Sequence, residues 1–373
     1  MAGVKTRKVA FLFLGETLLI PHLYPIVEAL AAAEPDLPIE LWVSTSMHEA
    51  LLGGWSEMLP SVRIRRAPGF RTLAGYNDGR NPPVPAKLPT LLRLLPHLLR
   101  TPVVVCAEQT SLWLPAMVPL RTRFVDTFHG AGSMMARGHW RRRAGWRTLV
   151  AAERDRQALI AGGDAPERVV TTGYVKAAFR QRTPAARLFA DTKPVILYTP
   201  HWQAHRSSWW TWGPAVVERI RADGRYNLIF APHQRLVERA PELRAFVAGL
   251  GGAAGVHADL DSFAMVDGSY TAAADLYLGD TSSQVVEYMM RPRPCVFLNA
   301  LGAAWRSDAS YAMWEAGDVV ESLDALIPAI DRAPIRHGDY AAFQRAFVQT
   351  ALGDVSGLAP ARAAAIVLEA LRR

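Results

Sequence analysis

The sequence predicts an α/β protein made of two Rossmann-like, doubly wound domains that face each other across a cleft. Apolar segments rich in β-branched residues alternate with helical patterns along the chain, and this alternation is interrupted at residues 181–194 before it begins again. At 373 residues the chain is long for one domain and comfortable for two. Repeated strand–helix units in two halves are typical of two parallel sheets covered by helices.

In the first half we expect buried strands that are mostly continuous apolar runs, as in parallel sheets with helices on both faces. The expected strands are residues 8–15, 39–45, 61–67, 102–108, 123–128 and 168–174. Helices are expected at 25–34 and 91–100. The second should bend at Pro96, because proline lacks the N–H donor that its helical turn needs.

The second half repeats the pattern. Its expected strands are residues 195–200, 227–233, 274–280 and 294–299, and its expected helices are 215–224, 241–249, 282–290 and 359–373. We therefore predict an N-terminal Rossmann-like domain at residues 1–183 and a C-terminal Rossmann-like domain at residues 184–350. Residues 351–373 are expected to form a helix that packs back toward the N-terminal domain.

The chain carries a formal net charge of +8, which suits nucleic acid, an anionic membrane surface or an anionic small substrate. No nucleic-acid-binding module is recognisable, so we expect no nucleic-acid partner. Basic residues interleaved with aromatic ones at 63–71 and 137–147, near the Leu-rich segment 89–102, favour an anionic membrane surface. A solvated basic face beside an ordinary amphipathic helix explains the same pattern.

Cysteine usage and the N-terminus indicate the compartment. Cys106 and Cys295 both lie in apolar runs typical of buried strands, so we expect no disulfide and a reducing environment. The apolar run 9–15 is too short to span a bilayer and lacks the cleavage site of a signal peptide. We predict a cytoplasmic protein, and peripheral attachment to the inner face of the membrane stays open as an alternative.

Three histidines stand where predicted strands end, at His129, His201 and His233. Ligands of open parallel sheets bind beyond the carboxyl ends of the strands. A single histidine at such a place is usually structural, but three from both halves would meet in one cleft. The residues Gly130, Gly132 and Ser133 follow the first of them. They would expose N–H groups to an anion, although a tight turn also needs such glycines.

The segment 274–299 gives the strongest local signal. A buried strand ends at Asp280, and Thr281, Ser282 and Ser283 then open a helix. Hydroxyls and unpaired N–H groups at a helix start form a phosphate site, while the alternative is an ordinary N-capped helix. Glu287 lies one turn further along the same helical face, where its carboxylate could accept hydrogen bonds from ribose hydroxyls.

No metal-binding pattern is visible: HExxH, paired CxxC and an Asp-x-Asp for a divalent ion are all lacking in the sequence. We expect no metal and no cofactor. The charge on a leaving phosphate group would then be stabilised by hydroxyls, helix ends and basic side chains.

Taken in order, the segments FHGAGS, TTGY, YTPHW, APHQ and LGDTSSQVVEYMMRPRPCVF resemble the CDP-glycerol glycerophosphotransferase family, which builds wall teichoic acid polymers. The resemblance covers about residues 120–300. It implies a GT-B fold in which residues 1–183 form the acceptor domain and residues 184–350 the donor-nucleotide domain. It also implies an enzyme that moves a glycerophosphate-like group from a CDP-linked donor to a hydroxyl of a lipid or glycan acceptor without a metal.

The resemblance also implies roles for residues. His129 would be the catalytic base that activates the acceptor hydroxyl, and His233 would be the catalytic histidine that contacts the donor phosphates. The run 281–283 would be the phosphate-binding helix start. The family's pattern has a proline where Gln234 stands here, a tyrosine in place of Thr281 and a threonine in place of His201.

Two other functions stay open on the same residues. A GT-B glycosyltransferase with a CMP- or UDP-linked sugar needs the same phosphate site and ribose carboxylate. A non-catalytic GT-B-like scaffold would keep the fold and bind no nucleotide.

Overall fold

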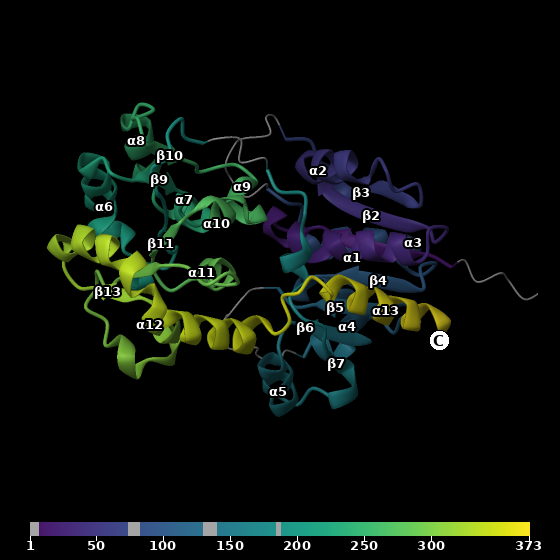
Figure 1. The fold of residues 1–373 in the computed structure, drawn as a ribbon. Coiled ribbons are helices and arrows are strands. Elements are labelled where there is room, and N and C mark those ends of the chain that lie inside the picture. The colour runs from purple at the N-terminus through teal and green to yellow at the C-terminus, as the bar shows by residue number, and fades with distance from the viewer. Residues whose placement is uncertain (1–6, 74–82, 130–139, 184–187) are drawn as a thin grey trace, which may run out of the picture.

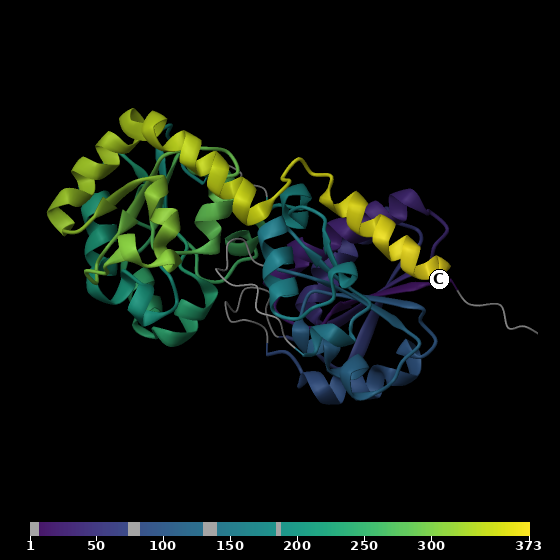
Figure 2. The same cartoon turned by 90° about the horizontal axis from the view of Figure 1, so that it is seen from below.

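Two parallel β-sheets, one in each half of the chain, form the framework of the computed structural model (Figures 1 and 2). The structure describes residues 7–73, 83–129, 140–183 and 188–373. Within these residues the first sheet has seven strands and the second has six. Helices cover the faces of both sheets. The predicted fold class, two doubly wound α/β units, is therefore confirmed.

The first sheet has the strand order β3-β2-β1-β4-β5-β6-β7, and every adjacent pair is parallel. The order reverses between β1 and β4, which is the switch point where doubly wound sheets bind ligands. The strands are β1 (Val9–Phe13), β2 (Ile39–Thr45), β3 (Val62–Arg71), β4 (Val103–Cys106), β5 (Arg123–Thr127), β6 (Arg147–Val150) and β7 (Val169–Thr171).

The helices of the first half follow the strands in alternation. They are α1 (Ile20–Ala33), α2 (Ser46–Ser56), α3 (Lys87–Leu98), α4 (Trp113–Met117) and α5 (Glu153–Ala161), with short 3-10 turns η1 (Thr17–Leu19), η2 (Gln109–Leu112), η3 (Arg142–Ala144), η4 (Pro166–Arg168) and η5 (Val175–Ala178). Helix α3 contains Pro96 and buries Leu91, Leu94 and Leu98 at helical spacing, so it packs as an amphipathic helix on the first sheet.

The second sheet has the order β10-β9-β8-β11-β12-β13, again parallel throughout, and reverses between β8 and β11. Its strands are β8 (Val195–Thr199), β9 (Asn227–Phe230), β10 (Val256–Ala258), β11 (Leu276–Gly279), β12 (Cys295–Leu298) and β13 (Asp318–Val320). Its helices are α6 (Trp209–Asp223), α7 (Gln234–Arg239), α8 (Glu242–Gly249), α9 (Ala264–Asp267), α10 (Ser269–Ala273) and α11 (Ser283–Tyr288), with 3-10 turns η6 (Ala204–Arg206), η7 (Trp305–Ser307), η8 (Ala309–Ala316) and η9 (Leu323–Ala325).

The last two helices join the halves. Helix α12 (Leu326–Leu352) lies on the second half, and α13 (Ala359–Arg372) runs back along the first, as Figure 2 shows. On α13 the side chains of Ala363, Ala364 and Val367 are buried in the same core as α1. The first sheet ends at Thr171 and the second begins at Val195, so the predicted boundary near residue 183 falls in the segment between them.

The central strands are apolar because both their faces are covered. Cys106 and Cys295 are buried on β4 and β12 and neither forms a disulfide. Three short strands, β6, β10 and β13, were not expected from the sequence. Each is four residues or fewer and includes a polar residue, such as Arg147 at the start of β6, so none of them forms a long apolar run. The part of the basic segment 137–147 that the structure describes leads directly into this strand.

Among the described helices, none is both long and apolar enough to cross a bilayer.

Gly173 ties the end of the first sheet to the turn between α12 and α13. Its φ of 94° lies in the left-handed region, and a Cβ there would come within 2.7 Å of the Asp354 carbonyl oxygen. That oxygen also accepts the backbone N–H of Tyr174 at 2.9 Å. A side chain at position 173 would therefore push the turn away from the sheet.

We predict that Gly173→Ala lowers the free energy of unfolding by about 2 kcal/mol or more, because left-handed strain and a backbone clash add together. Gly224→Ala is the matched control. Gly224 also has a positive φ, 72°, but no atom within 4 Å of the added Cβ, so only the strain of about 1 kcal/mol remains. Urea denaturation of both variants measures the difference, and equal losses would contradict this account of the turn.

Candidate active site between the two halves

A cavity of about 230 Å³ lies where the carboxyl edges of the two sheets face each other. Both halves line it. The first half contributes residues that follow β1, β5 and β7, and the second contributes residues that follow β9 and β11. The polar side chains that matter most are those of His22, His129, Lys176, His233, Ser282 and Glu287. The structure thus brings His129, His233, Ser282, Ser283 and Glu287, all predicted from sequence, to one cavity.

His129 lines the cavity two residues after β5. Its Nδ1 lies 2.6 Å from the carbonyl oxygen of Ala107, the residue that follows β4. Because a carbonyl oxygen only accepts, Nδ1 carries the proton and Nε2 has a free lone pair. Burial lowers the pKa of His129, so the ring is neutral near pH 7. A neutral imidazole with an unprotonated nitrogen is the form that a general base requires.

His233 takes the opposite tautomer. It caps α7, and its Nδ1 accepts the backbone N–H of Arg235 at 3.1 Å. The ring proton of the neutral form must then sit on Nε2. Burial lowers the pKa of His233 to about 3, with the nearby His201 and Arg235 acting in the same direction. This histidine is therefore a neutral hydrogen-bond donor suited to a phosphate oxygen.

His22 also lines the cavity, although no sequence pattern indicated it. It lies in the first turn of α1, with its ring 6.3 Å from that of His129 and 5.6 Å from that of Tyr174. Burial, then the charge of Lys176, holds its pKa well below the usual value. The predicted site histidines are those that directly follow a strand, and His22 lies inside a helix instead. The feature of the sequence that could have indicated His22 is its position near the start of the first helix after β1.

Ser282 and Ser283 line the cavity at the start of α11, but Thr281 does not. The hydroxyl of Ser282 accepts the backbone N–H of Gln284 at 3.2 Å and so caps the helix. The Thr281 hydroxyl points inward and donates to the Ser310 carbonyl at 2.8 Å. Of the three hydroxyls predicted to contact phosphate, the geometry leaves two for a ligand in the cavity.

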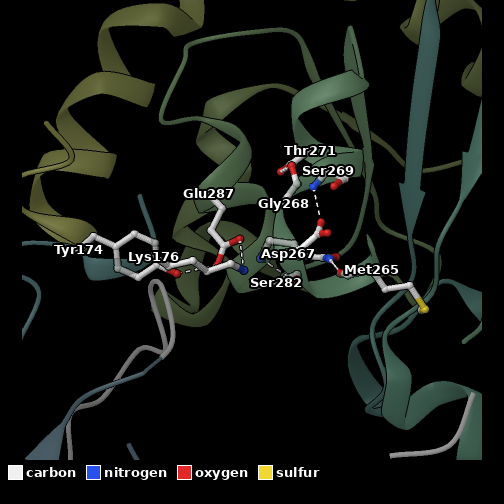
Figure 3. A network of polar contacts seen from close by, with 10 residues as sticks. Tyr174, Lys176, Met265, Asp267, Gly268, Ser269, Thr271, Ser282 and Glu287 are labelled. Carbon is white, nitrogen blue, oxygen red and sulfur yellow. Dashed lines mark hydrogen bonds and ion pairs between the residues drawn. The ribbon is translucent and has the colours of Figure 1, made fainter. Parts of the chain in front are cut away.

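Glu287 is buried at the cavity wall and is already paired. Its carboxylate accepts the Tyr174 hydroxyl at 2.6 Å and the Lys176 ammonium group at 2.7 Å, as Figure 3 shows. Both partners belong to the first half, so this is an ion pair between the halves. A second one joins Arg235 to Glu16 at 2.9 Å. Any ribose that binds Glu287 must share the carboxylate with Tyr174 and Lys176.

His201 lies beside the cavity rather than in its wall. Its ring is 6.0 Å from that of His233, and burial, then the charges of Arg206 and His205, lowers its pKa to about 4. Its backbone N–H donates to Asp280 at 2.8 Å, and the same oxygen accepts the N–H of Ser208 at 3.0 Å. Burial raises the pKa of Asp280 to about 7. These contacts fix the turn after β8, so His201 packs behind His233.

Gly130, Gly132 and Ser133 lie outside the described residues. Within the part of the chain that is described, no group of three or more His, Cys, Asp or Glu side chains is arranged to hold a metal ion.

Two doubly wound sheets with a cavity between their facing carboxyl edges define the GT-B fold. Known structures of this class match nearly the whole chain. A histidine variant of the wall teichoic acid polymerase TagF matches with a TM-score of 0.67 and 12% identity, over 99% of this chain and 90% of that one. The UDP-GlcNAc 2-epimerase from Methanocaldococcus jannaschii matches with a TM-score of 0.63 and 13% identity, over 97% and 99%.

The UDP-GlcNAc 2-epimerase from Neisseria meningitidis, bound to UDP-GlcNAc, matches with a TM-score of 0.62 and 12% identity, over 98% of this chain and 99% of that one. No protein-family model and no curated protein sequence matches the chain. At these identities the structural matches show the fold. The likeness of the motifs to enzymes that build teichoic acid is accompanied by a likeness in fold to a teichoic acid polymerase.

The Lys176–Glu287 pair gives a prediction about stability. Both side chains are nearly buried, with 11% and 7% exposed, so removal of the cation leaves a carboxylate without its charge partner. We expect Lys176→Met to lower the free energy of unfolding by about 3 kcal/mol and the double variant Lys176→Met/Glu287→Gln to recover part of it.

Arg221→Met is the matched control. Arg221 pairs with Glu218 at 2.6 Å but is 46% exposed, and an exposed pair contributes at most about 1 kcal/mol. Urea denaturation of the wild type, the two Lys176 variants and Arg221→Met measures the free energy of unfolding of each. A Lys176→Met loss no larger than that of Arg221→Met would show that the pair between the halves does not stabilise the fold.

Proposed function

We propose that this protein is a transferase that moves a glycerophosphate-like group from a CDP-linked donor to a hydroxyl of a lipid or glycan acceptor. The observation that carries the proposal is the opposite orientation of two neutral histidines at one cavity. His129 presents a lone pair and His233 presents an N–H. Sequence motifs that resemble the CDP-glycerol glycerophosphotransferases support the choice of reaction. So does the fold shared with TagF, one form of which was soaked with CDPG.

The acceptor side of the reaction belongs to His129. Its Nε2 removes the proton of the acceptor hydroxyl while that oxygen attacks the β-phosphorus of the donor. The new bond forms between the acceptor oxygen and this phosphorus, and the bond from phosphorus to the bridging oxygen of the diphosphate breaks. CMP leaves with that electron pair. The Ala107 carbonyl, at 2.6 Å from Nδ1, holds the ring in place and stabilises the imidazolium that forms.

The donor side is formed mostly by the second half, and the first half adds Lys176 to it. The Nε2–H of His233 and the hydroxyls of Ser282 and Ser283 contact the diphosphate, and Lys176 and Arg235 supply positive charge at the cavity wall. Donors fixed in advance around a developing negative charge lower the barrier without reorganisation during the step. Because Lys176 and Arg235 are held by Glu287 and Glu16, they are already positioned before the donor binds. The proposed step uses protein groups alone.

Glu287 keeps the ribose role that the sequence suggested. Its carboxylate has two oxygens, one on Tyr174 and one on Lys176, and each oxygen can accept a further hydrogen bond. The two first-half residues would then orient the carboxylate toward the sugar rather than block it.

Exposed apolar side chains of the first half support a membrane-bound acceptor. Leu92 and Leu99 of the α3 region are 45% and 59% exposed, and Trp140 is 52% exposed. Arg142 of the basic segment adds no exposed charge to the first half. It is buried, and its guanidinium lies 3.6 Å from the Asp126 carboxylate. The proposed peripheral contact with an anionic membrane surface therefore depends on the exposed apolar side chains and on arginines of the basic segments other than Arg142.

A nucleotide-sugar enzyme is the second candidate. The likeness to UDP-GlcNAc 2-epimerases favours it, since the same cavity suits a UDP- or CMP-linked sugar. The histidine pair favours phosphoryl transfer, because it supplies one group for the attacking hydroxyl and another for the diphosphate. A scaffold that lost catalysis would bind no nucleotide at all.

We predict that His129→Ala lowers kcat by 10²- to 10⁴-fold, the usual contribution of a general base, while the Kd for the donor changes little. His205→Ala is the control, because His205 is exposed and lies outside the cavity wall. Single-turnover assays with CDP-glycerol and calorimetric binding separate the two effects. Near-normal kcat in His129→Ala would remove this histidine from the reaction.

The pH dependence tests the same assignment. His129 acts only when neutral, and burial lowers its pKa below the usual value of 6.5. The rate should therefore rise with pH along a limb centred below pH 6.5 and stay level from there through neutrality. A profile of log(kcat/KM) between pH 4.5 and 8.5 measures it. A limb centred above pH 7 would contradict a buried, neutral His129 as the base.

A further inference from the structure

A second cavity lies at the edge of the first sheet that is remote from the active site. It has a volume of about 790 Å³. Pro102 comes just before β4, and Arg123 is the first residue of β5, so this cavity is at the amino ends of the strands. The end of α13 completes its wall, on the side of the molecule away from the second half (Figure 1).

Arginine dominates this cavity, and none of the described residues that line it is Asp or Glu. We call it the arginine cavity and define it by its six arginines, Arg7, Arg100, Arg121, Arg123, Arg372 and Arg373. Arg7 pairs with Glu34 at 3.1 Å, and Arg373 pairs with Glu369 at 2.9 Å.

Three of the arginines are unpaired. Within the described residues, the guanidinium groups of Arg100, Arg121 and Arg372 make no hydrogen bond and no ion pair. All three are exposed at the cavity. Like charges gathered in one place repel, and a bound anion would remove that repulsion.

Hydrogen bonds hold the two segments that line the arginine cavity before β4 and before β5. The hydroxyl of Thr101 donates to the His97 carbonyl at 2.9 Å, and that of Thr122 donates to the Leu98 carbonyl at 2.8 Å. The backbone N–H of Arg123 donates to the Pro102 carbonyl oxygen at 2.9 Å. The segments that carry Arg100 and Arg121 are thus fixed against each other.

Helix ends account for only part of this arrangement. Arginines near a helix C-terminus stabilise its last carbonyls, and Arg123 does so at Ala370, at 2.9 Å. Arg372 lies in the last turn of α13, where the same explanation applies. Arg121 stands in the loop before β5 and bonds no carbonyl, so it has no such role among the described contacts.

We propose that the arginine cavity binds a phosphate-bearing anion and is a ligand site separate from the active site. Guanidinium groups match phosphate oxygens in paired hydrogen bonds. The volume exceeds what one phosphate needs, so the ligand carries more than one phosphate or a phosphate with an attached group. Leu99 borders the cavity with 59% of its surface exposed and gives such a group an apolar contact. A soluble polyphosphate compound and the headgroup of an anionic phospholipid share this chemistry.

The test uses the full chain and two probes. Inorganic pyrophosphate stands for the soluble source, and vesicles of phosphatidylglycerol and phosphatidylcholine, compared with phosphatidylcholine alone, stand for the headgroup. The test variant is Arg100→Gln/Arg121→Gln. The control is Arg332→Gln/Arg345→Gln, which removes the same charge from exposed positions on α12. Calorimetry measures the affinity for pyrophosphate, and co-sedimentation measures the affinity for the vesicles.

We expect at least one probe to bind the wild type and to lose tenfold or more in affinity in the test variant, with less than a twofold change in the control. The probe that responds identifies the source. Hydrogen exchange should slow at residues 99–102 and 121–123 when that probe binds. The proposal is overturned if neither probe depends on Arg100 and Arg121, or if the control loses as much affinity.

The affinity for CDP-glycerol should be unchanged in the test variant. This readout keeps failure here distinct from failure of the proposed transferase function, which depends on the other edge of the sheet.

Discussion

The direction of one main-chain hydrogen bond at each of two histidines determines what the cavity can do. His129 donates from Nδ1 to a carbonyl oxygen, and His233 accepts at Nδ1 from a backbone N–H. Burial keeps both rings neutral near pH 7 because it lowers both pKa values. One ring therefore offers a lone pair and the other an N–H. The fold supplies this difference, because one histidine follows a strand beside β4 and the other caps a helix.

The two halves are joined firmly around this pair. Glu287 binds Lys176 and Tyr174 across the cavity, Arg235 binds Glu16, and α13 returns to pack on α1. These contacts define the cavity before any ligand enters. They also place two cations and two serine hydroxyls at its wall, which suits a diphosphate. In the proposed reaction His129 of the first half would take the proton, while Lys176 of the first half and Arg235 of the second would face the diphosphate.

The fold and much of the candidate site could be predicted because their signals are local. The run of Val103 to Cys106 is apolar because helices cover both faces of β4, and such runs show the parallel sheets directly. Histidines after strands, and Ser282 and Ser283 before a helix, follow from the same order of elements. Strands such as β13 are too short and too polar at their ends to give this signal.

Partners distant in the chain could not be predicted. Glu287 meets Lys176 across 111 positions, and the inward turn of the Thr281 hydroxyl depends on Ser310 from another loop. His22 enters the cavity from inside a helix, where the pattern of strand ends gives no signal. The arginine cavity likewise gathers residues that are distant in the chain, from Arg7 just before β1 to Arg373 after α13.

In the proposed function, the cavity between the halves binds the diphosphate of a CDP-linked donor. A calorimetric comparison of CDP-glycerol, other CDP-alcohols, CMP-sugars and UDP-sugars tests it most directly, with Ser282→Ala/Ser283→Ala as the variant. CDP-glycerol or another CDP-alcohol should bind most tightly, and the variant should bind it more weakly. Tighter binding of UDP- or CMP-sugars, or no nucleotide binding at all, would contradict it.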